Sequence, residues 1–415
     1  MAFFYRVRGY YDVTDYGAKG DGATDDTAAI QSAINAAQTA GGGVVWIPPA
    51  TFKVTGTTHA LIVTGDNVTI QGTGPGSVIA HGSTTGDTLF VQKDATGVLR
   101  NESVSVRDLQ FKPSVTKTAG NEVNVFYAYN IRIEGIRFQD CFRAIQVGST
   151  NSPSGDLYKF RPVFGFVRSI YGQRCCHAIL LMNCTDWWFD GVSFWLTDGP
   201  YATTTASGIT IDTNCQSCNF VNMDIVGDSP GVANTGAGLT IQDTLGGGFI
   251  GRTAYNQFTN CYFDSWGAGI VASNSEMFGF TNCWCAAPGG NGVTLASTTR
   301  GFMFNMHMCY TNGNHGFSLD GADHSISHSD VISNGLYGTG NGINVAATAS
   351  GFRILGNRIT NNAIYQVHGN QLYGITIASG ADNFIVKDND TRGNVTGGIN
   401  NLTTVAASRI VADNL

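Results

Sequence analysis

Residues 208–211 read Gly-Ile-Thr-Ile, and residues 238–241 repeat this pattern as Gly-Leu-Thr-Ile. The same short apolar strand, each time led by a small residue, recurs at intervals of 21 to 35 residues. The ten copies begin at Ala144, Ala178, Gly208, Gly238, Gly269, Gly292, Gly316, Gly342, Ala363 and Gly398. Repetition at this period is typical of a solenoid, in which each repeat packs only on its neighbours. The short β segments and the scarcity of helical patterns predict an all-β chain, a parallel β-helix.

A second family of apolar strands lies between the members of the first. Its members begin at Ile131, Trp187, Phe258, Phe280, Phe302, Ile326 and Phe352. Successive coils of a β-solenoid stack about 4.8 Å apart, the spacing of hydrogen-bonded strands. Residues that hold the same position in consecutive repeats are therefore predicted to be neighbours in space.

The N-terminal segment carries the one clear helical pattern. Thr24 or Asp25 is expected to cap the helix at its positive end. Apolar residues then recur at spacings of three and four, and three glycines end the segment at 41–43. The apolar face consists of Ile30, Ala33, Ile34 and Ala37. We predict an N-terminal segment with a capping helix over residues 1–53 and the β-helix over residues 54–415.

The run from Asp12 to Gln31, with Gly-Gly-Gly-Val-Val-Trp-Ile-Pro-Pro at 41–49, closely resembles the opening motif of the pectate-lyase-like superfamily. This resemblance implies a right-handed parallel β-helix with a short N-terminal capping helix. The superfamily contains polygalacturonases, other glycan hydrolases and lyases, and many phage tailspike depolymerases. The Asn-Thr-Asp and Asp-Asp motifs of polygalacturonases are missing, and only residues 314–316 are similar to their Gly-His-Gly. The resemblance implies a polysaccharide substrate other than that of a plant-cell-wall polygalacturonase.

Charge and composition narrow the choice of partners. The net charge is −7 and no cluster of Lys and Arg occurs, so nucleic acid and anionic membranes are poor candidates. No apolar stretch is long enough for a spanning helix. The first residues do not read as a secretory signal. We expect a virion or extracellular location without a signal peptide, or otherwise the cytoplasm, and the tailspike resemblance implies a homotrimer, which the sequence leaves open.

The ten cysteines do not follow a disulfide or zinc pattern. Cys261 and Cys283 hold the same position in adjacent coils, and Cys285 and Cys309 lie in strand-like runs. Buried thiols of this kind behave as small apolar groups. The sequence therefore predicts a ladder of free core cysteines, no metal site and no cofactor, with calcium left open.

Long coils mark the expected binding region. Extra residues enter as loops at 148–162, 196–207, 226–236 and 243–256, whereas the coils from Gly269 to Ala363 are shorter. Insertions in solenoid repeats gather on one face, often the binding face. Aromatic rings of this region are expected to stack on sugars, and we assign Trp195, Tyr201 and Trp266 to substrate binding.

Carboxylates in these loops predict hydrolysis. Asp198 and Asp228 each lie ten residues before a repeat glycine, and Asp264 opens the next loop. Asp212 and Asp243 follow two strands of the repeat at similar positions. Carboxyl groups one coil apart would lie near the ~5–5.5 Å of retaining glycosidases, and two coils apart near the ~9.5 Å of inverting ones. The leading hypothesis is an endo-acting glycoside hydrolase of a surface or capsular polysaccharide, of the phage-tailspike type.

Two alternatives remain. A polysaccharide lyase needs a base beside a uronate carboxylate and a cation that neutralises this carboxylate. His177 would be the base, Arg143 and Arg174 the cations, and His315 a further substrate contact. The second alternative is a tail or adhesin protein that binds glycan without cleaving it.

Overall fold

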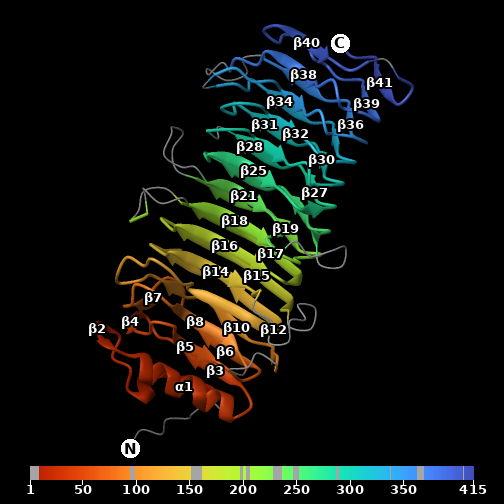
Figure 1. Ribbon diagram of the computed structural model, residues 1–415. Helices are drawn as coiled ribbons and strands as arrows, with labels where there is room; N and C mark the ends of the chain where they lie inside the picture. The colour runs from red at the N-terminus through yellow and green to blue at the C-terminus, as the bar shows by residue number, and fades with distance from the viewer. Residues whose placement is uncertain are drawn as a thin grey trace, which may run out of the picture. The chain divides into compact units, whose positions relative to one another are not determined.

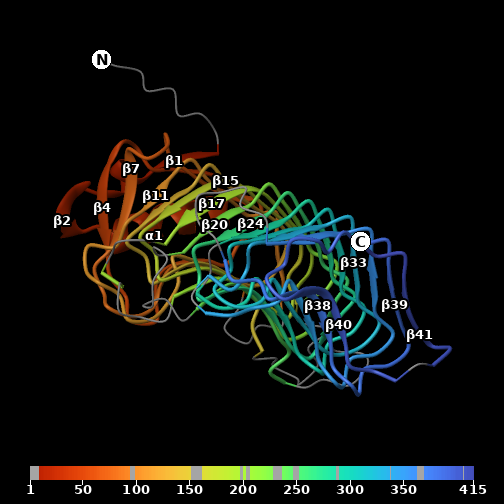
Figure 2. The same cartoon turned by 90° about the horizontal axis from the view of Figure 1, so that it is seen from above.

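A computed structural model describes residues 9–93, 99–150, 161–196, 200–201, 206–227, 236–245, 252–286, 289–336, 338–361, 369–404 and 406–415. The chain forms two compact units, residues 1–201 and 202–415. Both units are parallel β-helices, in which short strands pair with the equivalent strand of the next coil (Figure 1). Seen from above, the coils within each unit lie one behind another (Figure 2).

The first unit contains three rows of strands. Row 1 consists of β5 (His59–Val63), β8 (Asp87–Gln92), the start of β12 (Val123–Glu134), β14 (Arg143–Val147) and β16 (His177–Met182). Row 2 consists of β1 (Tyr10–Asp12), β3 (Gly43–Trp46), β6 (Val68–Gln71), β10 (Ser105–Arg107), the rest of β12, β15 (Val163–Gln173) and β17 (Thr185–Trp195). Row 3 consists of β2 (Asp21–Asp25), β4 (Ala50–Val54), β7 (Ser77–His81), β11 (Gln110–Phe111), β13 (Arg137–Gln139) and the end of β15. The short strand β9 (Asn101–Glu102) pairs with β12.

The second unit repeats this arrangement. Row 1 consists of β18 (Ser207–Asp212), β21 (Ala237–Ile241), β25 (Ala268–Ala272), β29 (Val293–Leu295), β32 (Phe317–Leu319), β35 (Ile343–Val345), β38 (Tyr373–Ile377) and β40 (Gly397–Asn401). Row 2 consists of β19 (Asn219–Val221), β23 (Gln257–Thr259), β27 (Gly279–Thr281), β30 (Met303–Asn305), β33 (Ser325–Ser327), β36 (Arg353–Leu355), β39 (Phe384–Lys387) and β41 (Arg409–Ala412). Row 3 consists of β20 (Asp224–Val226), β24 (Tyr262–Asp264), β28 (Trp284–Ala286), β31 (Met308–Tyr310), β34 (Asp330–Ile332) and β37 (Arg358–Thr360). A separate pair joins β22 (Thr253–Ala254) to β26 (Ser275–Glu276).

The repeated glycine before the row 1 strands has a steric cause in the second unit. A Cβ atom on Gly208 would lie 2.2 Å from the carbonyl oxygen of Gly238 in the next coil. The same atom on Gly269 would lie 2.4 Å from the carbonyl oxygen of Gly292. Close stacking of the coils at this corner therefore excludes larger residues, which explains the strongest signal of the sequence.

Stacked aromatic rings fill the core between the rows. Phe220 and Phe258 have ring centroids 4.3 Å apart, and Phe258 and Phe280 follow at 4.9 Å. The planes of these stacked rings are nearly parallel. These rings come from row 2 strands of consecutive coils, as the second family of repeats predicts. All ten cysteines are free and buried, so the predicted ladder of core thiols is confirmed.

One coil differs from the sequence-based register. The strand predicted at Ala363 falls on residues 362–368, which lie outside the described residues. The partner of β35 is β38, in which Gly374-Ile-Thr-Ile supplies the repeat. The additional residues between these strands lengthen that coil and move its repeat toward the C-terminus.

The expected helix is α1 (Thr27–Thr39), and Ile30, Ala33, Ile34 and Ala37 are fully buried on its inner face. It packs against β1, β3, β5 and β6 at the first coils (Figure 1). The N-cap residue is Asp26, not Thr24 or Asp25, and its carboxylate instead accepts hydrogen bonds from the backbone of Lys19 and Gly20. A short 3-10 helix, η1 (Val13–Tyr16), precedes it. Strand pairing begins at β1, so residues 10–54 contribute strands to the first coils as well as the helix.

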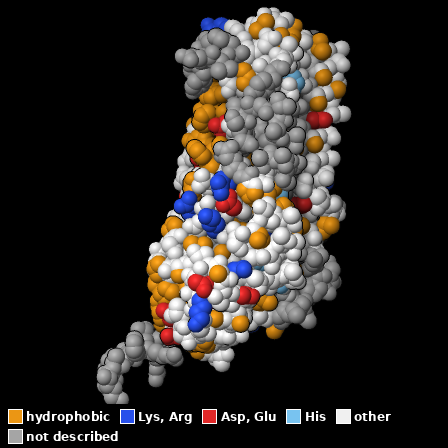
Figure 3. All heavy atoms as spheres, turned by 90° about the vertical axis from the view of Figure 1, so that its left-hand side faces the viewer, with side chains coloured by type: hydrophobic (Ala, Val, Ile, Leu, Met, Phe, Trp, Pro, Cys, Tyr) orange, Lys and Arg blue, Asp and Glu red, His pale blue; other side chains and the backbone are white. Residues whose placement is uncertain are grey.

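Charges are mixed along the surface. Basic and acidic side chains lie next to each other on the side drawn in Figure 3. Among the described residues, no helix has the length and apolar character required to cross a bilayer. A charged ligand would therefore be recognised by charged side chains that lie close together. The first unit contains such a group of side chains.

Candidate functional site

A row of polar residues stands at the start of the row 1 strands in the first unit. His59 pairs with Asp87, and Arg143 pairs with His177. Asn121 holds the same position on the coil between these two pairs. Val123 pairs with Leu89 on one side and with Ile145 on the other, so Asn121 aligns with both Asp87 and Arg143. We call His59, Asp87, Asn121, Arg143 and His177 the polar row. Its members lie on five consecutive coils, stacked at about 4.8 Å per coil.

Asp87 is the anion of the polar row. It is 5% exposed, and its carboxylate contacts His59 Nδ1 at 3.0 Å. The backbone N–H and side-chain amide of Asn121 donate to Oδ1 at 2.9 and 2.7 Å, and the amide of Asn124 donates to Oδ2 at 2.8 Å. Burial would raise the pKa of Asp87, but the hydrogen bonds from His59, Asn124 and Asn121 outweigh it and hold the pKa below its usual value. The carboxylate is therefore ionised and fixed in orientation at neutral pH.

Arg143 is the cation of the polar row. Its guanidinium donates to Asn121 Oδ1 at 3.2 Å and to Gln146 Oε1 at 3.4 Å. Among the described side chains, no carboxylate lies within ion-pair distance of this guanidinium. Burial lowers the pKa of Arg143, although it stays a cation. A half-buried guanidinium held by neutral amides is suited to receive an anionic ligand.

His177 lies beside Arg143 on the next coil. Burial, with the positive charge of Arg143, lowers the pKa of His177 to about 4. Its ring meets the edge of Phe142 at a centroid distance of 5.1 Å, and its Nε2 lies 3.5 Å from the thiol of Cys176. The imidazole is therefore neutral at physiological pH and lies next to a cation.

A second charged cluster lies beneath the polar row. Lys117 and Glu122 are fully buried and form an ion pair at 3.1 Å. Lys117 Nζ also lies 3.1 Å from His81 Nδ1, and the Thr88 hydroxyl donates to the Glu122 carboxylate. Burial and the charge of Lys117 lower the pKa of His81 to about 4, so this histidine is neutral. We call Lys117, Glu122, His81 and Thr88 the inner cluster; it fixes the start of β12, and with it the backbone of Asn121.

Of the carboxylates that the sequence assigned to catalysis, two are buried in the second unit and two lie outside the described residues. Asp198 and Asp228 lie outside the described residues, so their predicted proximity stays a prediction. Asp212 and Asp243 are buried in the second unit. Asp212 accepts hydrogen bonds from Gln242, Thr213 and Thr244, which anchor the turn after β21. This bonding is typical of a structural carboxylate.

Asp264 has a different environment in the second unit. It is half-buried on the outer side of β24, and burial raises its pKa. Asp224 on the neighbouring strand β20 is also half-buried, and burial together with the charge of Asp264 raises its pKa as well. Tyr262 and Trp284 pack edge to face beside them, with ring centroids 5.6 Å apart. A pair of carboxyl groups with raised pKa values is a feature of general acid catalysis.

The substrate-binding candidates divide by exposure. Trp195 is 50% exposed on β17, and β15 and β17 carry other exposed rings, among them Phe166 and Trp188 at paired positions; we call these exposed rings the aromatic face. Its members are Phe164, Phe166, Tyr171, Trp188 and Trp195. Each of these rings is partly exposed, so it can stack on a sugar ring.

The other candidates make internal contacts. Trp266 is 1% exposed and its indole donates to the Ile225 carbonyl at 3.0 Å; Tyr201 is buried and its hydroxyl lies 3.4 Å from the Asp140 carbonyl. Arg174 forms a two-pronged ion pair with Asp140. His315 Nδ1 accepts a hydrogen bond from the backbone of Asn341. The geometry does not support a substrate-binding role for these four residues, because the side chain of each is already engaged in core packing or in a contact with another residue.

Sequence reasoning missed most of the polar row. Residues 121–125 continue the repeat, but Glu122 stands where other coils carry a small residue, and the pattern is hidden there. His59 and Asp87 lie further upstream, before the first of the ten recognised repeats at Ala144. Extending the register of Arg143 and His177 back by one coil at a time would have found Asn121, Asp87 and His59.

Comparisons with known proteins agree with this architecture. Residues 10–141 match the family model described as "Rhamnogalacturonase A/epimerase, pectate lyase-like". The resemblance to the pectate-lyase-like superfamily is confirmed. Alginate lyase 7 of Azotobacter vinelandii is 34% identical over 152 residues, which cover 32% of this chain and 17% of that protein. The capsule-specific Depolymerase 1 of a Klebsiella phage is 31% identical over 146 residues, covering 31% of this chain and 18% of the phage protein.

Solved structures share the fold over most of the chain. The A-module of the mannuronan C-5 epimerase AlgE4 from Azotobacter vinelandii superposes with a TM-score of 0.62 at 18% identity, covering 95% of this chain and all of that module. The tailspike of the Escherichia coli bacteriophage HK620 superposes with a TM-score of 0.64 at 11% identity, covering 95% of this chain and 78% of the tailspike. These likenesses establish the parallel β-helix, and the chain spans less than a fifth of the length of the two curated relatives described above.

Proposed function

We propose that this chain is a polysaccharide-modifying enzyme that abstracts a proton beside a uronate carboxylate, with β-elimination as the outcome. The observation that carries the proposal is the juxtaposition of a neutral imidazole, His177, and a guanidinium without a described carboxylate partner, Arg143, on adjacent coils. A uronate needs both groups, since its carboxylate must be neutralised before the neighbouring C–H becomes acidic. Alginate and mannuronan, which the names of sequence relatives contain, are polymers of uronic acids, and this supports the same class of substrate.

The roles follow from the charges. Arg143 binds the uronate carboxylate and stabilises the negative charge that develops when the C5–H bond breaks. The lone pair of His177 takes that proton. The electron pair forms the C4=C5 double bond, and the C4–O bond to the leaving sugar breaks. The leaving oxygen takes a proton from the imidazolium or from water, and Asp87 keeps the amide of Asn121 directed toward Arg143.

The test is digestion of a panel of acidic polysaccharides, followed by the ultraviolet absorbance of unsaturated uronates. His177→Ala and Arg143→Gln are each expected to lower kcat/KM by about 10²–10⁴. His328→Asn and Arg168→Gln serve as matched controls, because His328 is an exposed histidine of the second unit and Arg168 pairs with Glu134. A rise in reducing ends without unsaturated product would reject elimination, as would full activity of both row variants.

A second candidate, hydrolysis, is supported by Asp264 and Asp224 with their raised pKa values. In that case Asp264→Asn would abolish the appearance of reducing ends, and no unsaturated sugar would form in the wild type. Asp330→Asn is the matched control, because Asp330 lies on the same row of strands but is held by Arg358. Polymer of unchanged length and composition after incubation would favour the non-catalytic glycan binder.

A further inference from the structure

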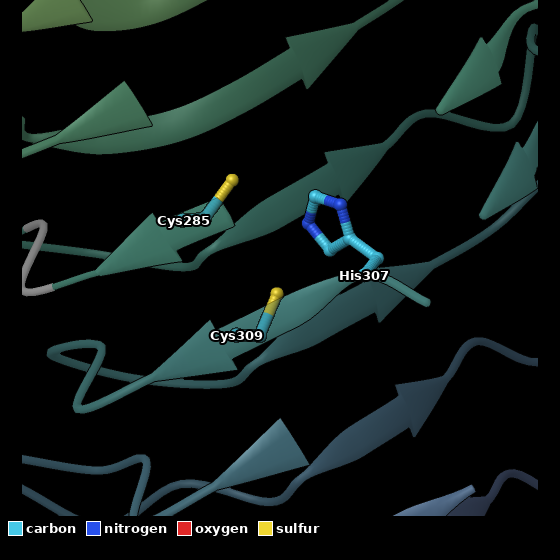
Figure 4. A group of neighbouring side chains, drawn as sticks. All are labelled: Cys285, His307 and Cys309. Carbon is cyan, nitrogen blue, oxygen red and sulfur yellow. The ribbon is translucent and has the colours of Figure 1, made fainter. Parts of the chain in front are cut away.

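Three buried ligand-type side chains meet in the core of the second unit. Cys285 on β28 pairs with Cys309 on β31, so their thiols stack one coil apart. His307 stands directly before β31 and faces them (Figure 4). One ligand atom from each of the three residues lies within 4.8 Å of the other two, and all three residues are fully buried.

The imidazole of His307 is the unusual member of this group. Neither of its ring nitrogens has a hydrogen-bond partner of normal geometry. The ring is enclosed by aromatic side chains, with centroids 5.2 Å from Phe304 and 5.7 Å from Phe317. A buried polar ring without hydrogen bonds is rare in folded proteins, and each such group calls for a partner that satisfies it.

The rest of the same column shows what satisfied polar residues look like here. Ser329 Oγ, Asn357 Oδ1 and Asn389 Oδ1 each accept a hydrogen bond from the backbone N–H of the residue one coil before them. The column thus continues from His307 through a ladder of side chains that are bonded from coil to coil. His307 departs from this ladder because its ring points toward two thiols instead of a backbone group.

We propose that Cys285, Cys309 and His307 form a binding site for one thiophilic d10 cation, Zn²⁺ or Cu⁺. Two thiolates and a neutral imidazole exactly balance the charge of Zn²⁺, which an apolar core tolerates far better than a net charge. Thiolate and imidazole ligands are also those that Cu⁺ accepts, and a set of three suits it without a further ligand.

The present spacing is close to that of a bound site. With metal–sulfur bonds of about 2.3 Å and metal–nitrogen bonds of about 2.0 Å, the ligand atoms of a three-coordinate ion lie roughly 4 Å apart. The observed upper limit of 4.8 Å needs a contraction of less than one ångström.

No metal site is predicted from the sequence, because the ligands do not form a cysteine or histidine cluster of zinc-site spacing along the chain. The ligands here are separated by 22 and 2 residues, so they converge only after one coil has stacked on the next. The spacing of the pair 283/285 and the pair 307/309 is equal, with a cysteine or histidine at each position. This 2-residue pattern at one coil length is the signal that identifies the site.

The test uses the reduced full-length protein, first analysed for its metal content as purified and then stripped and titrated anaerobically. Co²⁺ is the spectroscopic probe for the zinc arm, with a thiolate-to-metal charge-transfer band expected at one equivalent. Cu⁺ supplied from a chelator of known affinity is the second arm, and the ion found in the protein as purified identifies the native class. Binding is expected to raise Tm, since an ion that binds only the folded state stabilises it.

Two variants and one control make the outcome decisive. Cys309→Ala and His307→Phe should lose the stoichiometric binding, and Phe keeps an aromatic ring among Phe280, Phe304 and Phe317 if the alanine variant fails to fold. Cys261→Ala removes a buried thiol of the preceding coil and should bind as wild type does. The proposal is overturned if the wild type binds neither ion at one equivalent, or if Cys309→Ala and His307→Phe bind as tightly as Cys261→Ala.

Discussion

At the scale of single residues, Glu122 shows how one departure from the repeat changes the chemistry of a coil. It aligns with Ala144 in the next coil, where the repeat carries a small side chain. Its carboxylate reaches inward and is neutralised by Lys117, which is equally buried. A buried ion pair adds little to stability by itself, but the loss of one partner leaves an isolated charge in the core.

We expect Glu122→Gln to lower the free energy of unfolding of the first unit by about 3–5 kcal/mol, because Lys117 would lose its counter-charge. Urea denaturation followed by tryptophan fluorescence measures this, since Trp187 is buried in the same unit. Glu102→Gln is the control, because Glu102 is 55% exposed and pairs with Arg100 at the surface. Equal effects of both substitutions would contradict a structural role for the inner cluster.

The protonation of His177 gives a second prediction at this scale. Its pKa lies at about 4, below the usual 6.5, so the base form is present throughout the neutral and mildly acidic range and is lost only as the pH falls through about 4. We expect the acid limb of kcat/KM to reflect this low pKa. Titration of the His177 ring protons by NMR measures the pKa directly.

The same titration in Arg143→Gln separates the causes. Burial is the larger cause of the shift and the charge of Arg143 the smaller one, so the pKa of His177 should rise in the variant but stay below its usual value. A pKa near 6.5 in the wild-type protein would remove the electrostatic basis of the proposed base.

At the scale of elements, ladders of hydrogen bonds hold the turns between strands. Asn357 donates to the carbonyls of Ile326 at 2.9 Å and to Asn389 Oδ1 at 2.9 Å, and it accepts from the backbone of Ser329. Such ladders satisfy buried backbone groups where the chain turns between rows 2 and 3. Each side chain in the ladder therefore fixes the coils on both sides of it.

Asn357→Ala is expected to cost about 2–4 kcal/mol of local stability, since one buried N–H and one buried carbonyl lose their partner. Repeat proteins unfold in parts, so the suitable measurement is native-state hydrogen exchange at the Ser329 amide. Asn400→Ala, on the half-exposed outer side of β40, is the matched control. Unchanged protection at Ser329 would show that the ladder contributes nothing to the turn.

At the scale of the whole molecule, the homotrimer stays a prediction. The aromatic face exposes between 38% and 50% of five large rings on β15 and β17. Exposed large apolar rings favour burial against a partner. Light scattering should then give three times the chain mass of 44.0 kDa, and a concentration-independent monomer would contradict the trimer.

The comparison between sequence and structure has a physical pattern. The small residue before each row 1 strand, the apolar face of α1 and the buried thiols were all predictable, because each depends on a local and repeated steric requirement. The polar row was only half predictable. Arg143 and His177 fell in recognised repeats, whereas Asn121 lay in a coil whose pattern Glu122 interrupts, and His59 and Asp87 lay upstream of the recognised repeats.

By itself the sequence determined that this chain is a β-solenoid, since its short apolar strands recur in one register and each repeat must stack on its neighbours to bury its inner side chains. Only the tertiary structure decided which side chains meet. The number of residues per coil varies with loop length. The residues that stack on one another in consecutive coils therefore cannot be found from sequence intervals alone. Stacking therefore brought Arg143 to His177 and His307 to the thiol of Cys285, in each case across two coils.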